Sequence, residues 1–254
     1  MREDDGIRPH ASYGWAAKLG LIVPTSNTVN EGEWQILLSQ TQGISLHVAR
    51  MALHLEHAAP ASPLQLPAVL QAALAQLTPA GLDAIAYGCT AGSMISPLDA
   101  LSQAMHDETS LPCTTTASAL IYACRHLGMQ RVAVVTPYAD DLNAHEAAYL
   151  QAHGLDVLSI AGLGIGRDGP HEFCRIARVP EQDVYAHALA NWHPDADGML
   201  ISCTDFPTLR VVPALEARLG KPVISSNAAT LWRLLDSIGL RRAFAGYGQL
   251  LEHA

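Results

Sequence analysis

The sequence at residues 85–90 reads IAYGCT, and residues 199–204 read MLISCT, so one short pattern occurs twice, about half a chain apart. In each case an apolar run ends in Cys-Thr. Such a run predicts a buried strand that carries a thiol at its carboxyl end, where open α/β sheets bind their ligands. We therefore expect Cys89 and Cys203 to face one small site from opposite sides of a substrate.

Strand-like and helix-like segments alternate on both sides of these two strands. Alternating units of this kind imply parallel sheets with helices on both faces, which is the α/β class. The two halves also echo each other, because each Cys-Thr is followed by two helical segments, the second ending at Gly128 or Gly239. We predict two related lobes with a site in the cleft between them. Further predicted strands cover residues 19–24, 44–51, 131–136, 155–160 and 222–226.

The boundaries of the two lobes are predicted from the same alternation. Residues 1–15 are expected to form a flexible extension. Residues 16–120 together with 226–254 are expected to form the first lobe, and residues 121–225 the second.

Composition excludes several classes of function. The 254 residues are 49% hydrophobic and 15% charged, which allows a sizeable core. The formal charge of −9, without a basic cluster, argues against nucleic acid and anionic membranes as partners. No apolar run approaches the ~20 residues that span a bilayer, and the acidic start lacks a signal-peptide core. Five cysteines without a C-x-x-C pair fit free thiols in a reducing cytoplasm.

Polar turns follow several predicted strands. The first strand ends in Thr25-Ser26-Asn27-Thr28, which holds more hydroxyl and amide groups than a helix N-cap requires, so we expect carboxylate binding there. Backbone N–H groups near Thr90 and the equivalent Thr204 are expected to stabilise a thiolate or bind a carboxylate.

Other patterns indicate little. Residues 164–169 satisfy G-x-G-x-x-G, but a proline follows at once and no acid ends a following strand at the required distance, so we expect a loop bordering the cleft. No set of cysteines and histidines has zinc spacing, and G-x-S-x-G is absent, so we expect neither a metal nor a serine hydrolase elbow.

Four motifs together resemble one known group of enzymes. They are GLIVPTSNT at residues 20–28, YGCT at 87–90, TPY at 136–138 and SCT at 202–204. They resemble the aspartate/glutamate racemase superfamily, in its branch of maleate cis-trans isomerases and arylmalonate decarboxylases, over residues 19–248. This resemblance implies two Rossmann-like lobes related by a pseudo-twofold axis, an interlobe active site without a cofactor, small carboxylate substrates, and a dimer or tetramer.

The resemblance also assigns roles to individual residues. Cys89 and Cys203 occupy the two cysteine positions, Asn27 matches an asparagine that binds substrate carboxylate, and Tyr138 matches the tyrosine of the site. The decarboxylases are similar to this chain over residues 138–143, so Asn143 is expected to bind substrate as well. They contain glycine at the position of Cys89, however, whereas maleate isomerases contain both cysteines and a further asparagine that residues 162–170 lack.

Three enzymatic reactions and one binding function remain open. In the first, Cys89 adds as a thiolate to the alkene of a cis-dicarboxylate and Cys203 protonates the neighbouring carbon, so that rotation gives the trans isomer. In the second, the two thiols racemise a carbon next to a carboxylate. In the third, Cys203 alone protonates an enediolate left by decarboxylation. The non-enzymatic alternative is a two-lobed protein that binds a small acid.

Overall fold

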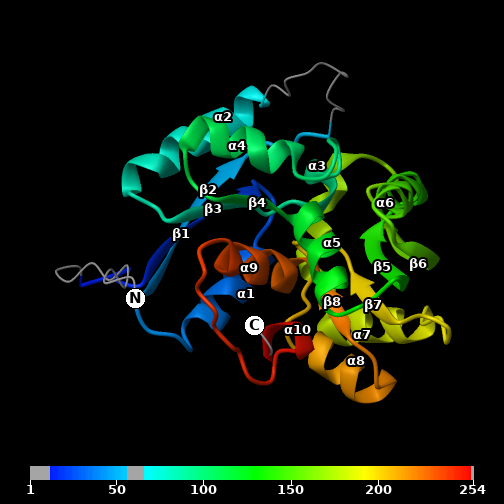
Figure 1. The fold of residues 1–254 in the computed structure, drawn as a ribbon. Coiled ribbons are helices and arrows are strands. Elements are labelled where there is room, and N and C mark those ends of the chain that lie inside the picture. The colour runs from blue at the N-terminus through cyan, green and yellow to red at the C-terminus, as the bar shows by residue number, and fades with distance from the viewer. Residues whose placement is uncertain (1–11, 56–65, 253–254) are drawn as a thin grey trace.

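The computed structural model describes residues 12–55 and 66–252, and these contain two four-stranded parallel sheets (Figure 1). The first sheet has the order β2-β1-β3-β4 and the second the order β6-β5-β7-β8, so one topology occurs twice. This repetition confirms the prediction of two parallel α/β lobes. The strands are β1 Ala17–Pro24, β2 Ile44–Met51, β3 Ala84–Tyr87, β4 Cys113–Thr115, β5 Arg131–Tyr138, β6 Asp156–Ile165, β7 Gly198–Ile201 and β8 Val223–Ser225.

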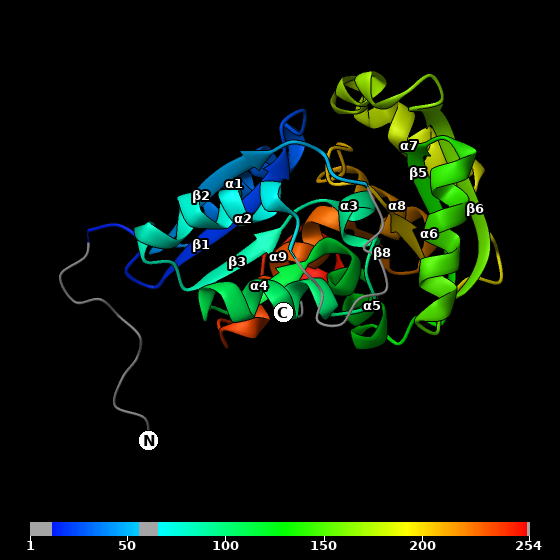
Figure 2. The ribbon, with the colours of Figure 1, turned by 90° about the horizontal axis from the view of Figure 1, so that it is seen from above.

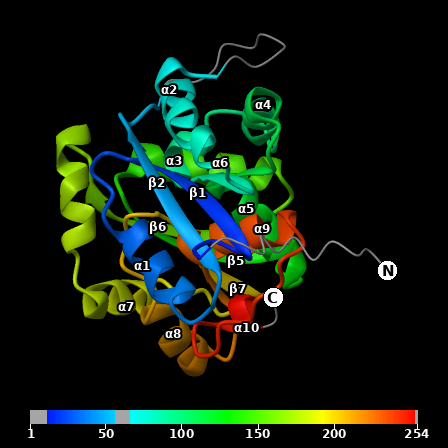
Figure 3. The same cartoon turned by 90° about the vertical axis from the view of Figure 1, so that its left-hand side faces the viewer.

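The central strands are apolar because both faces of each sheet are covered. Leu19, Leu21 and Val23 of β1 are all fully buried, as expected for an inner parallel strand. In the first sheet, α2 and α4 lie over one face and α1 and α9 over the other (Figures 1 and 3). The helices up to the middle of the chain are α1 Val29–Leu38, α2 Ala68–Leu77, α3 Thr90–Ser93, α4 Ala100–Thr109 and α5 Thr116–His126.

Two elements of the second half differ from the prediction. Strand β6 ends at Ile165, five residues beyond its predicted end. The prediction is too short because Gly162 and Gly164 are typical of loops. A 3-10 helix, η2, follows at Pro170–Arg178 and was not predicted, since its one-sided apolar pattern is short. The other helices are α6 Asp140–Ala152, α7 Glu181–Ala190, α8 Val211–Leu219, α9 Ser226–Ser237 and α10 Gln249–Glu252.

Helices α5 and α9 pack against each other between the two sheets (Figure 2). Helix α5 follows β4 of the first sheet but contacts β8, and α9 follows β8 but contacts β3 and β4. The two helices begin alike, because the hydroxyls of Thr115 and Ser225 accept hydrogen bonds from backbone N–H groups three residues on. Each lobe therefore contributes a helix to the other, which joins them in one core.

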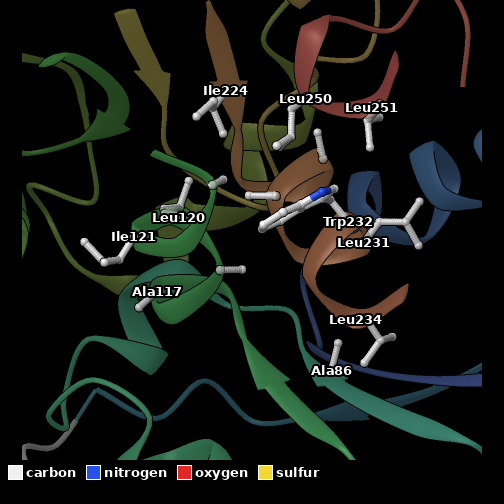
Figure 4. Close-up of a cluster of buried hydrophobic side chains, with 14 of the residues drawn as sticks. Ala86, Ala117, Leu120, Ile121, Ile224, Leu231, Trp232, Leu234, Leu250 and Leu251 are labelled. Atoms are coloured by element: carbon white, nitrogen blue, oxygen red, sulfur yellow. The ribbon is translucent and has the colours of Figure 1, made fainter. Parts of the chain in front are cut away.

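This shared core is apolar and closely packed. Leu120 of α5 and Leu231 of α9 are fully buried in it, beside Ile224 of β8 (Figure 4). The predicted lobe boundaries at residues 120 and 226 stay a prediction, and residues 1–11 of the predicted extension lie outside the described residues. Within the described ranges, no helix combines the length and apolar character that crossing a membrane requires.

Candidate active site

A small cavity of about 40 Å³ lies at the carboxyl ends of the central strands of both sheets. Pro24 ends β1, Cys89 follows β3, Tyr138 ends β5 and Cys203 comes shortly after β7, and all four residues line this cavity. Its volume exceeds the space that one water molecule needs. The cavity therefore has room for more than one water-sized group, and residues of both lobes line it.

Cys89 lies in the turn between β3 and the short helix α3. Its sulfur accepts a hydrogen bond from the backbone N–H of Gly92 at 3.3 Å, so the cysteine is also the N-cap of that helix. Burial raises the pKa of the Cys89 thiol to about 11, while the Gly92 N–H and the hydroxyl of Tyr87 act in the opposite direction. The thiol is protonated at neutral pH.

Cys203 holds the equivalent position in the second lobe. The backbone N–H of Asp205 donates a hydrogen bond to its sulfur at 3.4 Å. Burial raises the pKa of the Cys203 thiol further than that of Cys89, and the nearby charge of Asp205 adds to this rise. Loss of hydration outweighs the few donors that each sulfur meets, so neither thiol pKa is lowered toward neutrality.

Tyr138 lines the cavity together with both thiols. It is buried, and its pKa lies well above the usual value because of burial and the neighbouring Cys203 and Cys89 sulfurs. Its phenol in turn lowers the pKa of Cys203, although by less than burial raises it. Tyr138 therefore lies at the cavity, where the resemblance placed the tyrosine of the site.

A chain of buried hydrogen bonds joins the two Cys-Thr turns. The side-chain amide of Asn27 donates to the Thr204 hydroxyl at 2.9 Å, and that hydroxyl donates to the carbonyl oxygen of Gly88 at 3.1 Å. The Thr90 hydroxyl lies 2.9 Å from that of Ser226 at the start of α9. Asn27, Thr90 and Thr204 all line the cavity, so these contacts also fix part of its wall.

Two buried carboxylates bind the loop after Cys203 to helix α1, and the sequence analysis missed both. Oδ1 of Asp205 accepts hydrogen bonds from the backbone N–H groups of Thr28 and Val29, at 2.8 and 3.2 Å. Oε1 of Glu33 accepts from the backbone N–H groups of Thr208 and Leu209, at 2.6 and 2.8 Å. The sequence does not indicate the role of these two acids, because their hydrogen-bond partners lie more than 170 residues away along the chain.

One wall of the cavity is apolar. Leu53, Leu142, Phe173 and Ile176 line it, and the last two come from η2. Phe173 and Leu142 also border a second, larger cavity of about 500 Å³, which opens beside the first. The wall was missed because η2 itself was not predicted.

Not every predicted site residue reaches the cavity. Ser26 lines it, but Thr25 is exposed and does not. Asn143 is buried in α6, where its Oδ1 accepts a hydrogen bond from the Thr136 hydroxyl at 2.6 Å, and it does not line the cavity either. Its amide oxygen connects the start of α6 to β5, and substrate contact by Asn143 stays a prediction.

The G-x-G-x-x-G segment at residues 164–169 runs from the end of β6 to Gly169, the N-cap of the 3-10 helix η2. Ile165, Gly166 and Arg167 line the larger cavity, so the segment borders the cleft, although its first two residues belong to the strand and not to a loop. In the described part of the chain, no three His, Cys, Asp or Glu side chains are grouped as ligands for a metal ion.

Comparison with known proteins gives a consistent group of relatives. A family model for arylmalonate decarboxylase matches residues 19–251. Arylmalonate decarboxylase of Bordetella bronchiseptica is 38% identical over 159 residues, which cover 61% of this chain and 64% of that enzyme, slightly less than two thirds of its length. Maleate isomerase of Nocardia farcinica is 29% identical over 246 residues, which cover 92% of this chain and 95% of that enzyme.

Solved structures give the same result. A cysteine-to-serine mutant of the Nocardia farcinica maleate cis-trans isomerase, with a covalently bound succinylcysteine intermediate, superposes with a TM-score of 0.83 at 27% identity, covering 94% of this chain and 99% of that one. A crystal structure of arylmalonate decarboxylase has a TM-score of 0.77 at 28% identity and covers 93% and 100%. These matches confirm the resemblance that the sequence motifs indicated, and the chain belongs to the arylmalonate decarboxylase family.

Proposed function

We propose that this chain is a cofactor-independent isomerase that acts on a small carboxylate through two cysteines, in the manner of maleate isomerases. The observation that supports this most directly is the position of Cys89 and Cys203. Both are buried, both line one cavity, and they enter it from different lobes. Two thiols on opposite sides of a small molecule suit addition to one carbon and proton transfer at the next.

The different surroundings of the two sulfurs support different roles. Each sulfur meets one backbone N–H and one tyrosine hydroxyl, but the charge of Asp205 acts on Cys203, so Cys89, whose pKa is raised less, is the better thiolate. Cys203, whose pKa is raised more, stays a thiol and is the proton donor. We therefore assign the nucleophile to the first lobe and the acid to the second.

In the proposed reaction, the thiolate of Cys89 forms a carbon–sulfur bond with one alkene carbon of the cis substrate. The electron pair of the alkene moves onto the neighbouring carbon, where the adjoining carboxylate shares the charge as an enediolate. The Cys203 thiol protonates this carbon, which leaves a thioether with a single bond that can rotate. Removal of the same proton by the Cys203 thiolate and departure of the Cys89 thiolate then give the trans alkene and regenerate the Cys203 thiol and the Cys89 thiolate.

Groups on the cavity wall are proposed to hold the carboxylates. They are the side chain of Ser26, the second amide N–H of Asn27, the phenol of Tyr138 and the turns at Thr90 and Thr204. Such fixed donors stabilise the charge that develops on the enediolate. The succinylcysteine in the Nocardia farcinica maleate isomerase structure is the kind of thioether that this route produces in that protein.

A second candidate is chemistry through an enediolate without addition to an alkene, either decarboxylation or racemisation. The apolar wall of Leu53, Leu142, Phe173 and Ile176 favours it, because a wall of this kind suits a substrate with an apolar group beside its carboxylate. The similarity to the Bordetella bronchiseptica decarboxylase points in the same direction. Both reactions would use Cys203 as the group that protonates carbon.

Incubation in deuterated water, followed by proton NMR and by measurement of released carbon dioxide, separates these reactions. Isomerisation of maleate converts one vinyl signal into another, decarboxylation of an arylmalonate releases carbon dioxide, and racemisation of a 2-arylpropionate brings deuterium into recovered substrate. The isomerase proposal predicts the first result, with loss of activity in both Cys89→Ala and Cys203→Ala. Binding of the acid without any of the three reactions, and unchanged binding in both variants, would instead identify a small-acid binding protein.

Two further parts of the proposal follow from the family resemblance. We propose a homo-oligomer, a dimer or tetramer, that works in the cytoplasm. Light scattering coupled to size-exclusion chromatography measures the first, and cell fractionation measures the second.

A further inference from the structure

We propose that Asp205 is a positioning residue that fixes Cys203 in the cavity and places a negative charge beside its thiol, which favours the protonated form. The proposal rests on the proposed role of Cys203 as proton donor. It concerns a residue two positions from that cysteine, in the loop that leads from β7 to α8. The side chain is 6% exposed and lines the same cavity as the two thiols.

Two backbone hydrogen bonds hold the carboxylate of Asp205 at the start of helix α1. Oδ1 accepts hydrogen bonds from the backbone N–H groups of Thr28 and Val29, which open helix α1 in the first lobe. A carboxylate at the start of a helix is stabilised by these donors and by the helix dipole. Asp205 therefore anchors the second-lobe loop on a rigid element of the first lobe.

Asp205 also contacts the sulfur of Cys203. The backbone N–H of Asp205 donates to Sγ of Cys203 at 3.4 Å, so the residue that is anchored by its side chain orients the thiol by its backbone. Between the two, Thr204 donates to the carbonyl of Gly88, directly before Cys89. Through Thr204 and Asp205, the loop that carries Cys203 is hydrogen-bonded to the first lobe, next to Cys89.

The effect of Asp205 on the thiol is also electrostatic. A negative charge two residues from a thiol disfavours the thiolate, and the charge of Asp205 raises the pKa of Cys203. Burial raises the pKa of Asp205 itself to about 6, so its carboxyl is ionised at neutral pH. This charge acts in the same direction as burial, which is the larger cause of the protonated state of the Cys203 thiol.

The charged groups around Asp205 are engaged with other partners and do not neutralise its carboxylate. Arg50 of β2 lowers the pKa of Asp205, but its guanidinium is paired with Glu31 of α1 at 2.8 Å and donates to the carbonyl of Asn27. From α1, Glu33 is engaged with the loop at Thr208. On the cavity side the titratable neighbours are Cys203, Cys89 and Tyr138.

The test uses Asp205→Asn, which removes the charge but keeps the side-chain oxygen that accepts from Thr28 and Val29. Asparagine is as good an N-cap as aspartate, so the variant is expected to fold. Asp197→Asn is the matched control, because Asp197 also accepts backbone hydrogen bonds, from Gln130 and Arg131, but does not line the cavity.

The whole folded chain, without substrate, is alkylated with iodoacetamide from pH 7 to 10. Peptide mass spectrometry after digestion then measures the alkylation rate of each cysteine. In Asp205→Asn, Cys203 is expected to react about tenfold faster at a given pH, which corresponds to a pKa lower by about one unit. Cys89 is the internal reference in the same sample. Asp197→Asn is expected to match the wild-type protein at both cysteines.

Activity gives an independent readout. The decline of kcat at high pH is expected to move to lower pH in Asp205→Asn, with KM nearly unchanged, and to stay in place in Asp197→Asn. An unchanged alkylation profile of Cys203 in Asp205→Asn would overturn the proposal, whatever the activity. A faster alkylation of Cys203 in a protein that shows no isomerase activity would support the positioning role and count only against the proposed function.

Discussion

The hydroxyl of Thr204 donates a hydrogen bond to the carbonyl oxygen of Gly88 at 3.1 Å, which joins the residue after one cysteine to the residue before the other. The same hydroxyl accepts from the side-chain amide of Asn27 at 2.9 Å. The side chains of Thr204 and Asn27 are almost completely buried. This hydroxyl is thus the shortest link between the two Cys-Thr turns, and it fixes their relative position.

Thr204→Val is expected to weaken both the fold and the reaction. Valine has nearly the same shape, but it leaves the Gly88 carbonyl and one N–H of Asn27 buried without a partner, which costs about 1–3 kcal/mol of the free energy of unfolding. The kcat is expected to fall about tenfold because the two sulfurs lose their fixed spacing. Urea unfolding and steady-state kinetics measure the two effects. Thr204→Ser keeps the hydroxyl and is the control; equal kcat values for all three proteins would refute the role of this bond.

The pKa of Cys89 predicts how its reactivity depends on pH. With the pKa near 11, the thiolate is a small fraction at neutral pH and increases about tenfold for each pH unit up to that value. The alkylation rate of Cys89 in the substrate-free protein is expected to increase in this way from pH 7 to 10. Exposed Cys174 is the reference for alkylation in the same sample. A rate for Cys89 that levels off below pH 8 would contradict the protonated resting state.

Asp205→Asn is expected to stabilise the protein although it impairs the site. Burial raises the pKa of Asp205 from 3.8 to about 6 in the folded protein, so folding opposes its ionisation. A raised carboxyl pKa means that stability is highest below pH 4 and is lost as the pH rises through 6; removing the charge restores on the order of 2 kcal/mol at pH 7.5. Thermal unfolding at pH 7.5 and at pH 4 measures this. An equal gain at both pH values would assign the effect to packing instead of charge.

Much of the fold could be predicted because short sequence segments indicate its strands and the ends of its helices. The apolar runs that end at Tyr87 and at Ile201 identify buried parallel strands, and the glycines after the helices mark where each unit ends. The pairing of Cys89 with Cys203 was also predictable, since both follow such strands. What joins the lobes was not predictable from the sequence alone, because the exchange of α5 and α9 depends on packing between distant segments.

The parts of the site that sequence reasoning missed have a common physical cause. Asp205 and Glu33 are ordinary acids in the sequence, and only their distant backbone partners make them part of the site. Asn143 shows the converse: it stands in a matching motif, but the sequence does not reveal that its amide oxygen accepts a hydrogen bond from Thr136. The raised pKa of each thiol arises from burial, which a list of neighbouring donors in the sequence does not reveal.

Glu146 of α6 gives the last prediction. It is almost completely buried, and among the described residues its Oε1 has no partner within ordinary hydrogen-bond geometry; the same holds for the hydroxyl of Ser202, which lies next to Cys203 in the sequence. Burial raises the pKa of Glu146 to about 8, and interaction with Ser202 lowers it by less. The carboxyl is therefore largely protonated at pH 7, and it becomes charged inside the core only at alkaline pH.

The sign of the pH dependence follows from this raised pKa. Stability is greatest below the unfolded value of 4.5 and is lost as the pH rises through 8, by an amount on the order of 3 kcal/mol. Glu146→Gln has no proton to lose, so its free energy of unfolding in urea is expected to change much less between pH 6 and pH 9 than that of the wild-type protein. Glu108→Gln, on the exposed surface of α4, is the matched control and is expected to follow the wild type. If Glu146→Gln loses as much stability as the wild type between these pH values, the buried carboxyl is not the group that titrates.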